Sequence, residues 1–310
     1  MTRARVVLNP TSGHERGPDY VELLSSRLRE RYDAVEFAVT TGSGDAEAAA
    51  GVAVRDGCTA LFVAGGDGTL NEVLNGLQSA GALDRVAIGV VPLGTGNDFA
   101  SALGIPAGVE EAVEALSLAS ELRVDLGQVN GRVFVNTSGG GFIAEVSTAV
   151  TPQLKTIAGR LAYLIGGAQA LMEFEPVHAT VVLEPGSRRL RHPLHAFAVC
   201  NSRLIGGGRL IAPDAVIDDG LLDVCLIEAM SAMEFVALAR KVADGEHVHD
   251  ARVLYLQASS LDIELERAVK VNTDGEVFEG RRCQYRVLPK AARFFAVNAP
   301  FATGASPPSA

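Results

Sequence analysis

The stretch TALFVAGGDGTLNEVLNGL, residues 59–77, decides the fold of this chain. Its apolar beginning at 59–64 predicts a buried strand, and the apolar residues of 70–77 recur three and four positions apart, as in an amphipathic helix. The glycine-rich residues 65–69 between them must form a tight loop. N–H groups in such a loop and at the start of a helix attract an anion, above all a phosphate. The sequence therefore predicts a phosphate-binding loop at 65–69.

Asp67 is an unusual residue for a phosphate-binding loop. A carboxylate beside a phosphate costs free energy unless a cation joins the two, and Mg²⁺ is the usual cation in such sites. The alternative is structural, because Asp67 or Thr69 could simply cap the helix that follows. The composition of the loop and the elements on both sides of it favour the phosphate site.

Two further loops have a similar character. Residues 92–100, PLGTGNDFA, also lie between an apolar run and a helix, and Gly94 and Gly96 open their backbone. An ordinary strand–helix turn is the alternative for this loop. Residues 9–13, NPTSG, follow the first apolar run of the chain. In a parallel sheet such loops meet at the carboxyl ends of the strands, where ligands bind, so the three are expected to lie together.

The order of elements predicts two domains, since strands and helices alternate before residue 125 and strands dominate after it. In the first part we expect strands at 3–8, 35–39, 59–64 and 87–91, with helices at 19–32, 44–56, from 70, from 99 and at 109–119. In the second part we expect strands at 123–129, 132–137, 178–184, 195–200, 222–228, 252–257, 261–265, 268–273 and 285–288, with helices at 153–173 and 231–243.

The predicted fold class is therefore α/β plus β. Residues 1–125 form an α/β domain with a parallel sheet, and residues 126–290 form a β-sandwich-like domain with inserted helices. Residues 291–310 are a C-terminal segment whose end, from 302 on, we expect to be disordered because it is small and contains proline.

The composition excludes several classes of protein. The 310 residues are 48% hydrophobic and carry a net charge of −10, which argues against disorder and against a nucleic-acid partner. No run of about 18 apolar residues predicts a membrane span. No G-x-x-x-x-G-K-[ST], G-x-S-x-G or H-E-x-x-H motif is present, so P-loop, hydrolase-elbow and zincin chemistry are not expected. We expect a cytoplasmic protein, and the composition leaves peripheral contact with a bilayer open.

The motifs together resemble the diacylglycerol kinase catalytic family, which includes bacterial soluble lipid kinases and the eukaryotic sphingosine and ceramide kinases. The resemblance covers about residues 4–290. Besides the three loops it includes Asp125-Leu126-Gly127, Gly139–Phe142, Gly206–Gly208, Ala212–Ala215, Asp219–Asp223 and Asp274-Gly275-Glu276. It implies an NAD-kinase-like α/β domain, a β-rich second domain and an active site in the cleft between them. It also implies ATP-dependent transfer of the γ-phosphoryl group to the hydroxyl of a membrane lipid, diacylglycerol or a related alcohol.

The resemblance also implies roles for particular residues. The ATP site would be formed by Asn9, Thr40, Gly65, Gly66, Asp67, Gly68, Thr69, Leu70, Asn71, Glu72, Thr95, Gly96 and Asn97. Asp67 would organise Mg²⁺ through water, and Glu276 would take the proton of the lipid hydroxyl with Asp274 close by. Without the resemblance, residues 274–276 would be interpreted as a hairpin turn.

A second, structural metal site is implied for the segment that contains Asp218-Asp219-Gly220. There Asp219 would offer a carboxylate, and Val216 and Leu221 would offer backbone carbonyls. Oxygen ligands of this kind suit Mg²⁺ or Ca²⁺. A plain turn is the alternative.

Two departures from the family leave questions open. Bacterial relatives often carry lysines where this chain has His14 and Gly166, and cations offset charge in phosphoryl transfer. Weaker catalysis, a different substrate, and replacement by Lys155 or Arg160 all remain open. So do two other functions, a soluble-substrate kinase of the NAD kinase kind, which the GGDGT loop supports equally, and a non-catalytic nucleotide-binding regulator.

The partners are less well defined by the sequence. Arg188, Arg189 and Arg191 follow a Pro185-Gly186 turn, where they could meet anionic lipid headgroups or simply form a solvated hairpin. A pocket for the acyl chains of a lipid would be lined by apolar side chains, which the sequence does not distinguish from ordinary core residues. The oligomeric state is also open, and a homodimer is among the arrangements that the sequence allows.

Overall fold

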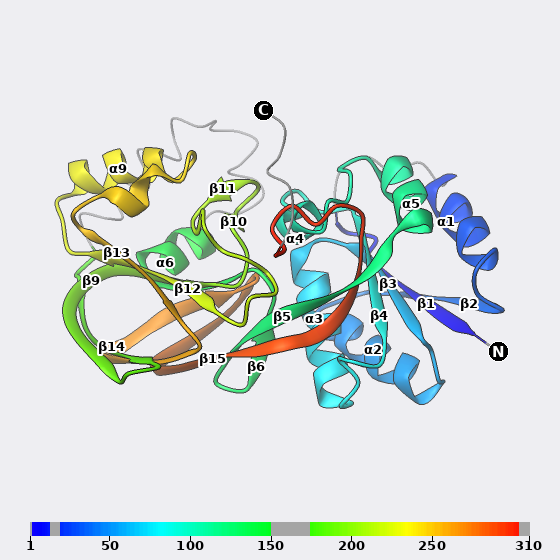
Figure 1. Cartoon of the computed structure of the whole chain (residues 1–310), viewed down its shortest axis with the longest axis horizontal. Helices are drawn as coiled ribbons and strands as arrows, with labels where there is room; N and C mark the ends of the chain where they lie inside the picture. The colour runs from blue at the N-terminus through cyan, green and yellow to red at the C-terminus, as the bar shows by residue number, and fades with distance from the viewer. Residues whose placement is uncertain (1, 13–18, 150–173, 304–310) are drawn as a thin grey trace.

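A computed structural model describes residues 2–12, 19–149 and 174–303. The positions of His14, Lys155, Arg160 and Gly166, the helix expected at 153–173 and the tail 304–310 lie outside the described residues. Figure 1 shows two domains, an α/β domain at one end of the molecule and a β-rich domain at the other.

The α/β domain is built on four parallel strands in the order β4-β3-β1-β2. Their bounds are β1 Arg3–Leu8, β2 Ala34–Val39, β3 Ala60–Gly65 and β4 Ala87–Pro92. Strands β3 and β4 are buried along their whole length, which explains why they have continuous apolar sequences instead of alternating ones. The expected parallel sheet is confirmed.

Helices cover both faces of this sheet (Figure 1). They are α1 Asp19–Arg29, α2 Asp45–Arg55, α3 Asp67–Ser79, α4 Asp98–Ala102 and α5 Val109–Leu118. Helix α3 packs closely on α2, because Gly76 approaches the carbonyl oxygen of Glu47 so closely that a Cβ there would lie 2.3 Å from it. The contact holds the C-terminal half of α3 against α2.

The β-rich domain contains antiparallel strands and few helices. Its strands are β5 Ser120–Val129, β6 Arg132–Phe134, β7 Thr137–Gly141, β8 Val177–Glu184, β9 Arg188–Cys200, β10 Leu204–Ile205, β11 Arg209–Leu210, β12 Leu222–Glu228, β13 Val253–Ala258, β14 Ser260–Thr273 and β15 Glu276–Ala296. Its described helices are α6 Phe142–Ala149, α9 Ala232–Lys241 and the 3₁₀ helix η1 Glu246–His249. None of the helices in the described part of the chain is long and apolar enough to cross a bilayer.

Strands β5 and β15 run through both domains and join their sheets (Figure 1). The end of β15 pairs with β4 in parallel, with Arg293 opposite Ala87, and Phe294 and Phe295 are buried in the α/β core. Thr303 still has a fixed partner, since its N–H and hydroxyl donate to Asp218. The expectation of disorder from residue 302 is therefore wrong as far as 303, because these last described residues return to the body of the protein.

Three other details differ from the prediction. The strand expected at 132–137 is split into β6 and β7, because the backbone N–H groups of 135–137 turn away from the ladder to a carboxylate described below. The strands expected at 261–265 and 268–273 are one strand, β14, with an irregularity between Glu264 and Val269. Strand β15 is far longer than the expected 285–288, because its alternating charged residues belong on a half-exposed sheet.

Candidate active site

The three glycine-bearing loops meet at the carboxyl edge of the parallel sheet. Gly66 and Gly94 lie so close that a Cβ on Gly94 would be 2.7 Å from the Cα of Gly66. Asn9 links the loop at 9–13 to the one at 65–69, because its side-chain N–H₂ donates to the hydroxyl of Thr69 over 2.9 Å. The prediction that the loops lie together is confirmed for their described residues.

The N-terminus of α3 points into this meeting place. Its N-cap residue is Gly66, which has no side chain with which to cap the helix. The N–H groups of the first turn have no intrahelical acceptor, and the helix dipole adds partial positive charge there. An uncapped helix of 13 residues behind a glycine loop has the features that a phosphate requires.

Asp67 does not cap its own helix but the next one. Its Oδ2 accepts the N–H of Asp98 and its Oδ1 accepts the N–H of Phe99, both over 3.2 Å at the start of α4. Oδ1 also accepts a hydrogen bond of 3.1 Å from the side chain of Asn136, which belongs to the second domain. A carboxylate has about four acceptor sites, so Asp67 retains one for a ligand.

Asp98 makes a second link between the domains. It is buried, and its carboxylate accepts the N–H groups of Gly207 at 3.1 Å and Gly208 at 2.8 Å. Burial raises the pKa of Asp98, and the nearby charge of Asp67 acts in the same direction. The loop at 94–98 is thus tied both to the phosphate-binding loop and to the glycine run at 206–208.

The acidic turn at 274–276 is a hairpin turn and also part of the site. Asp274 and Gly275 join β14 to β15 with φ values of +48° and +100°, the left-handed values that a two-residue hairpin requires. The Asp274 carboxylate points inward and accepts the N–H groups of Val135 at 2.7 Å and Thr137 at 2.9 Å. It also accepts a bond of 3.3 Å from Asn71 on α3. The turn is therefore fastened to the helix of the phosphate-binding loop.

Asn136 connects the two candidate carboxylates directly. Its backbone N–H donates to Asp274 and its side-chain N–H₂ donates to Asp67. Asn136 is only 5% exposed, so this connection is internal. The predicted juxtaposition of the phosphate-binding loop with the acidic turn is therefore present in the structure.

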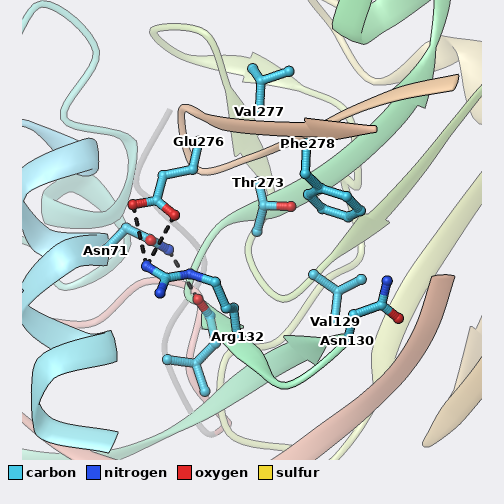
Figure 2. Close-up of a pocket in the computed structure, with 9 residues that line it drawn as sticks. Asn71, Val129, Asn130, Arg132, Thr273, Glu276, Val277 and Phe278 are labelled. Carbon is cyan, nitrogen blue, oxygen red and sulfur yellow. Dashed lines mark hydrogen bonds and ion pairs between the residues drawn. The ribbon is translucent and has the colours of Figure 1, made fainter. Parts of the chain in front are cut away.

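Glu276 lies at the surface of the same region, on the rim of a pocket of about 240 Å³. The pocket is lined by Asn71, Val129, Asn130, Arg132, Val133, Thr273, Glu276, Val277 and Phe278 (Figure 2). The Glu276 carboxylate does not point to Asp274 but to Arg132, with 3.0 Å between Oε2 and Nη2. An apolar floor and a charged rim thus lie next to the acidic turn.

Burial raises the pKa of Asp274 to about 6, and the charge of Asp67 adds to the effect. A folded-state pKa above the usual value of about 3.9 means that the bound proton stabilises the folded state. This contribution to the unfolding free energy is complete below about pH 4 and is lost as the pH rises through 6. We expect the wild type to lose about 3 kcal/mol of unfolding free energy relative to Asp274→Asn between pH 4 and 8.

Urea unfolding of both proteins across this pH range measures that difference. The amide changes the hydrogen bonds at every pH, so it adds only a constant offset, and the titrating groups that do not interact with Asp274 cancel. A difference between the two proteins that stays flat with pH would contradict the raised pKa.

Other residues expected in the nucleotide site are placed as follows. Thr40 is buried at the end of β2 and donates to Leu8, while Asn97 closes its own loop by bonding Gly94. Glu72 accepts the N–H of Ala46 and so caps α2. The side chain of Leu70 is buried in the core, so a nucleotide could meet only its backbone. The roles assigned to these residues stay predictions.

The segment expected to hold a second metal combines two buried carboxylates, Asp218 and Asp223, with the exposed Asp219. Asp219 accepts the N–H of Leu221, and Asp125 accepts the N–H groups of Gly220 and Lys290. Desolvation raises the pKa of both Asp125 and Asp219. Within the described residues no three His, Cys, Asp or Glu side chains are grouped as metal ligands. A site made of Asp219 with the carbonyls of Val216 and Leu221 stays a prediction.

Two residues of the site, Asn136 and Arg132, have no counterpart in the sequence prediction. Asp98 belongs to the loop at 92–100 that was singled out, although its hydrogen bonds from Gly207 and Gly208 were not expected. Asn136 and Arg132 fall in the run 132–137 that the sequence presents as one strand, and only their pairing with residues about 140 positions away gives them a place in the site.

Comparison with known proteins agrees with this architecture. The model of the diacylglycerol kinase catalytic domain matches residues 3–129, and that of the YegS C-terminal NAD kinase beta sandwich-like domain matches residues 138–296. A diacylglycerol kinase of Bacillus subtilis is 34% identical over 277 residues, which cover 89% of this chain and 90% of the relative. One of Staphylococcus carnosus is 34% identical over 88% of each chain.

Among solved structures, a diacylglycerol kinase of Bacillus anthracis has the same fold, with a TM-score of 0.72 at 21% identity, covering 95% of this chain and 96% of that one. The fold, the site and the matching domain models define a two-domain lipid kinase. More specifically, the chain belongs to the diacylglycerol kinase catalytic family.

Proposed function

We propose that this protein transfers the γ-phosphoryl group of ATP to the hydroxyl of a membrane lipid, with diacylglycerol or a related lipid alcohol as acceptor. The observation that carries the proposal is the fastening of the acidic turn to the phosphate-binding loop through Asn71 and Asn136. Phosphoryl transfer needs a phosphate cradle and a proton acceptor near one point. Relatives that span nearly the whole chain are named diacylglycerol kinases, which supports the acceptor class.

The side chains divide the chemistry between them. The uncapped start of α3 and the loop at 94–98 bind the triphosphate, and Glu276 takes the proton of the lipid hydroxyl as the new P–O bond forms. Asp67 and Asp98 form the acidic neighbourhood that a hydrated Mg²⁺ fits, since Asp67 keeps one free acceptor site. When bound, Mg²⁺ offsets the charge of the transferring phosphates.

A lipid acceptor requires contact with a bilayer, so we propose a cytoplasmic protein that associates with the membrane peripherally. The arginines 188, 189 and 191 at the exposed β8–β9 hairpin are the surface that supports this contact. Each cation near an anionic membrane contributes about 1 kcal/mol. Neither a homodimer nor a monomer is favoured by a described contact.

The test uses ATP labelled in its γ-phosphate, Mg²⁺ and vesicles made from a total lipid extract, with the products identified by mass. We expect labelled phosphate in a lipid product, and vesicles enriched in diacylglycerol should yield phosphatidic acid. A parallel reaction contains NAD in place of vesicles. Label in NAD alone would support a soluble-substrate kinase, and ATP binding without any transfer would support a regulator.

A further inference from the structure

The charges around the candidate site are strongly unbalanced. The carboxylates of Asp67, Asp274 and Glu276 lie at the phosphate-binding loop and the acidic turn, and the carboxylate of Glu47 on α2 shares Arg132 with Glu276. In the described ranges 2–12, 19–149 and 174–303, Arg132 is the only cationic side chain that contacts any of them. A nucleoside triphosphate brings several more negative charges, of which one Mg²⁺ offsets only two, so a cationic side chain that faces the phosphates favours phosphoryl transfer here.

Arg132 is held by contacts that are easily exchanged. Its Nη2 lies 3.0 Å from Glu276 and 3.1 Å from Glu47 on α2, and its side chain is 46% exposed. Figure 2 shows the guanidinium reaching toward the Glu276 carboxylate across the pocket. Exposed ion pairs of this kind contribute about 0–1 kcal/mol, whereas a guanidinium binds phosphate oxygens with two parallel hydrogen bonds. A phosphate can therefore replace a carboxylate on Arg132 at little cost.

The backbone places Arg132 beside both halves of the reaction. It follows the tight turn Asn130-Gly131, whose φ values of +47° and +96° bring β6 back along β5. Asn71, which stands one turn into α3 behind the phosphate-binding loop, lines the same pocket as Arg132 and Glu276. Arg132 thus shares one pocket with the helix that receives the phosphates and with the proposed base.

We propose that Arg132 binds the terminal phosphate of the donor nucleotide and is a catalytic residue of this protein. The inference rests on the proposed function. When the nucleotide binds, the guanidinium leaves Glu276 for the γ-phosphate. The lipid oxygen then forms its bond to the γ-phosphorus while the bond to the bridging oxygen breaks, and the electron pair stays on the departing ADP. The hydroxyl proton goes to the freed Glu276 carboxylate, and Arg132 is unchanged.

The experiment compares Arg132→Ala and Arg132→Lys with a control, Arg252→Ala, which removes an ion pair to Glu234 of similar length and exposure. Binding of ADP and of a non-hydrolysable ATP analogue is measured by fluorescence titration. We expect Arg132→Ala to weaken the analogue by about tenfold or more and to leave ADP nearly unchanged. Turnover with ATP and diacylglycerol vesicles should fall by roughly 10²–10³, with partial recovery in Arg132→Lys.

The outcomes separate this proposal from the proposed function. Arg132→Ala that binds the analogue and ADP with wild-type affinities overturns the role of Arg132. If the wild type binds the ATP analogue and ADP with different affinities but labels no lipid, the lipid acceptor is overturned. The role of Arg132 is still supported in that case if Arg132→Ala binds the two nucleotides with equal affinities. A wild type that binds neither nucleotide overturns both. The melting temperature of each variant, expected near that of the wild type, shows that the fold is retained.

Discussion

Replacing Glu276 with glutamine is expected to leave ATP affinity nearly intact and to lower turnover by roughly 10²–10⁴. A lipid hydroxyl is a weak acid, so its attack on phosphorus needs a base, and the amide of glutamine cannot accept the proton. Glu276 suits this task because it is 39% exposed on the pocket rim and its only described ion pair is with Arg132. Steady-state kinetics with diacylglycerol vesicles and equilibrium binding of an ATP analogue measure the two quantities separately.

Glu279→Gln is the matched control, because it makes the same change three residues further along β15 on an exposed side chain. It should retain wild-type turnover. If Glu276→Gln retains it as well, Glu276 is not the base, and Asp274 becomes the remaining carboxylate of the turn that could take the proton. A weaker binding of the ATP analogue by Glu276→Gln would instead assign the residue to the nucleotide site.

The α/β half of the fold could be predicted because its signals are local. A buried parallel strand is a continuous apolar run, and the connections that follow β3 and β4 contain glycine at the turns themselves. Strand β1 has the predicted bounds, Arg3–Leu8. Helix α3 begins at Asp67, three residues before the expected Leu70, so the expected loop at 65–69 is shorter than predicted and only Gly66 lies between β3 and α3. Such patterns need only the neighbouring residues to be interpreted.

The β-rich half depends on partners that are distant in sequence. Strand β15 leaves the second domain and ends in the first, because Phe294 and Phe295 fill the α/β core beside β4. The residues near 285–296 contain no local pattern that predicts pairing with the α/β domain. The break between β6 and β7 has the same origin, since the backbone at 135–137 serves the carboxylate of Asp274. A long-range hydrogen bond overrides the local strand preference there.

The candidate site divides in the same way. The glycine loops and the acidic turn could be located from the sequence, because clusters of glycine and aspartate are unusual directly after apolar strands. Asn136 and Arg132 could not, since a single asparagine or arginine in a strand is ordinary until its partner is known. Both lie on the short connection between β5 and β7, which the sequence presents only as a hairpin, and both reach a carboxylate of the acidic turn.

Asp67→Asn is expected to lower turnover by roughly 10²–10³ and to cost about 1–3 kcal/mol of unfolding free energy. The substitution removes the negative charge that faces the proposed Mg²⁺ site. It also places an N–H₂ group opposite donors, because both oxygens of Asp67 accept N–H groups from α4. Turnover is measured across a range of Mg²⁺ concentrations, and we expect the variant to need more Mg²⁺ than the wild type, while urea unfolding gives the stability.

Asn136→Ala separates the two effects of Asp67→Asn. It removes the side-chain donor to Asp67 but leaves the carboxylate and its charge in place. If Asp67 acts through a cation, Asn136→Ala should lose stability by a similar amount, retain most of its turnover and show the wild-type dependence on Mg²⁺. Equal losses of turnover in the two variants, with the same Mg²⁺ dependence, would mean that Asp67 only holds α4 in place. The acid in the phosphate-binding loop would then be a helix cap after all, and the site would need another source for its metal.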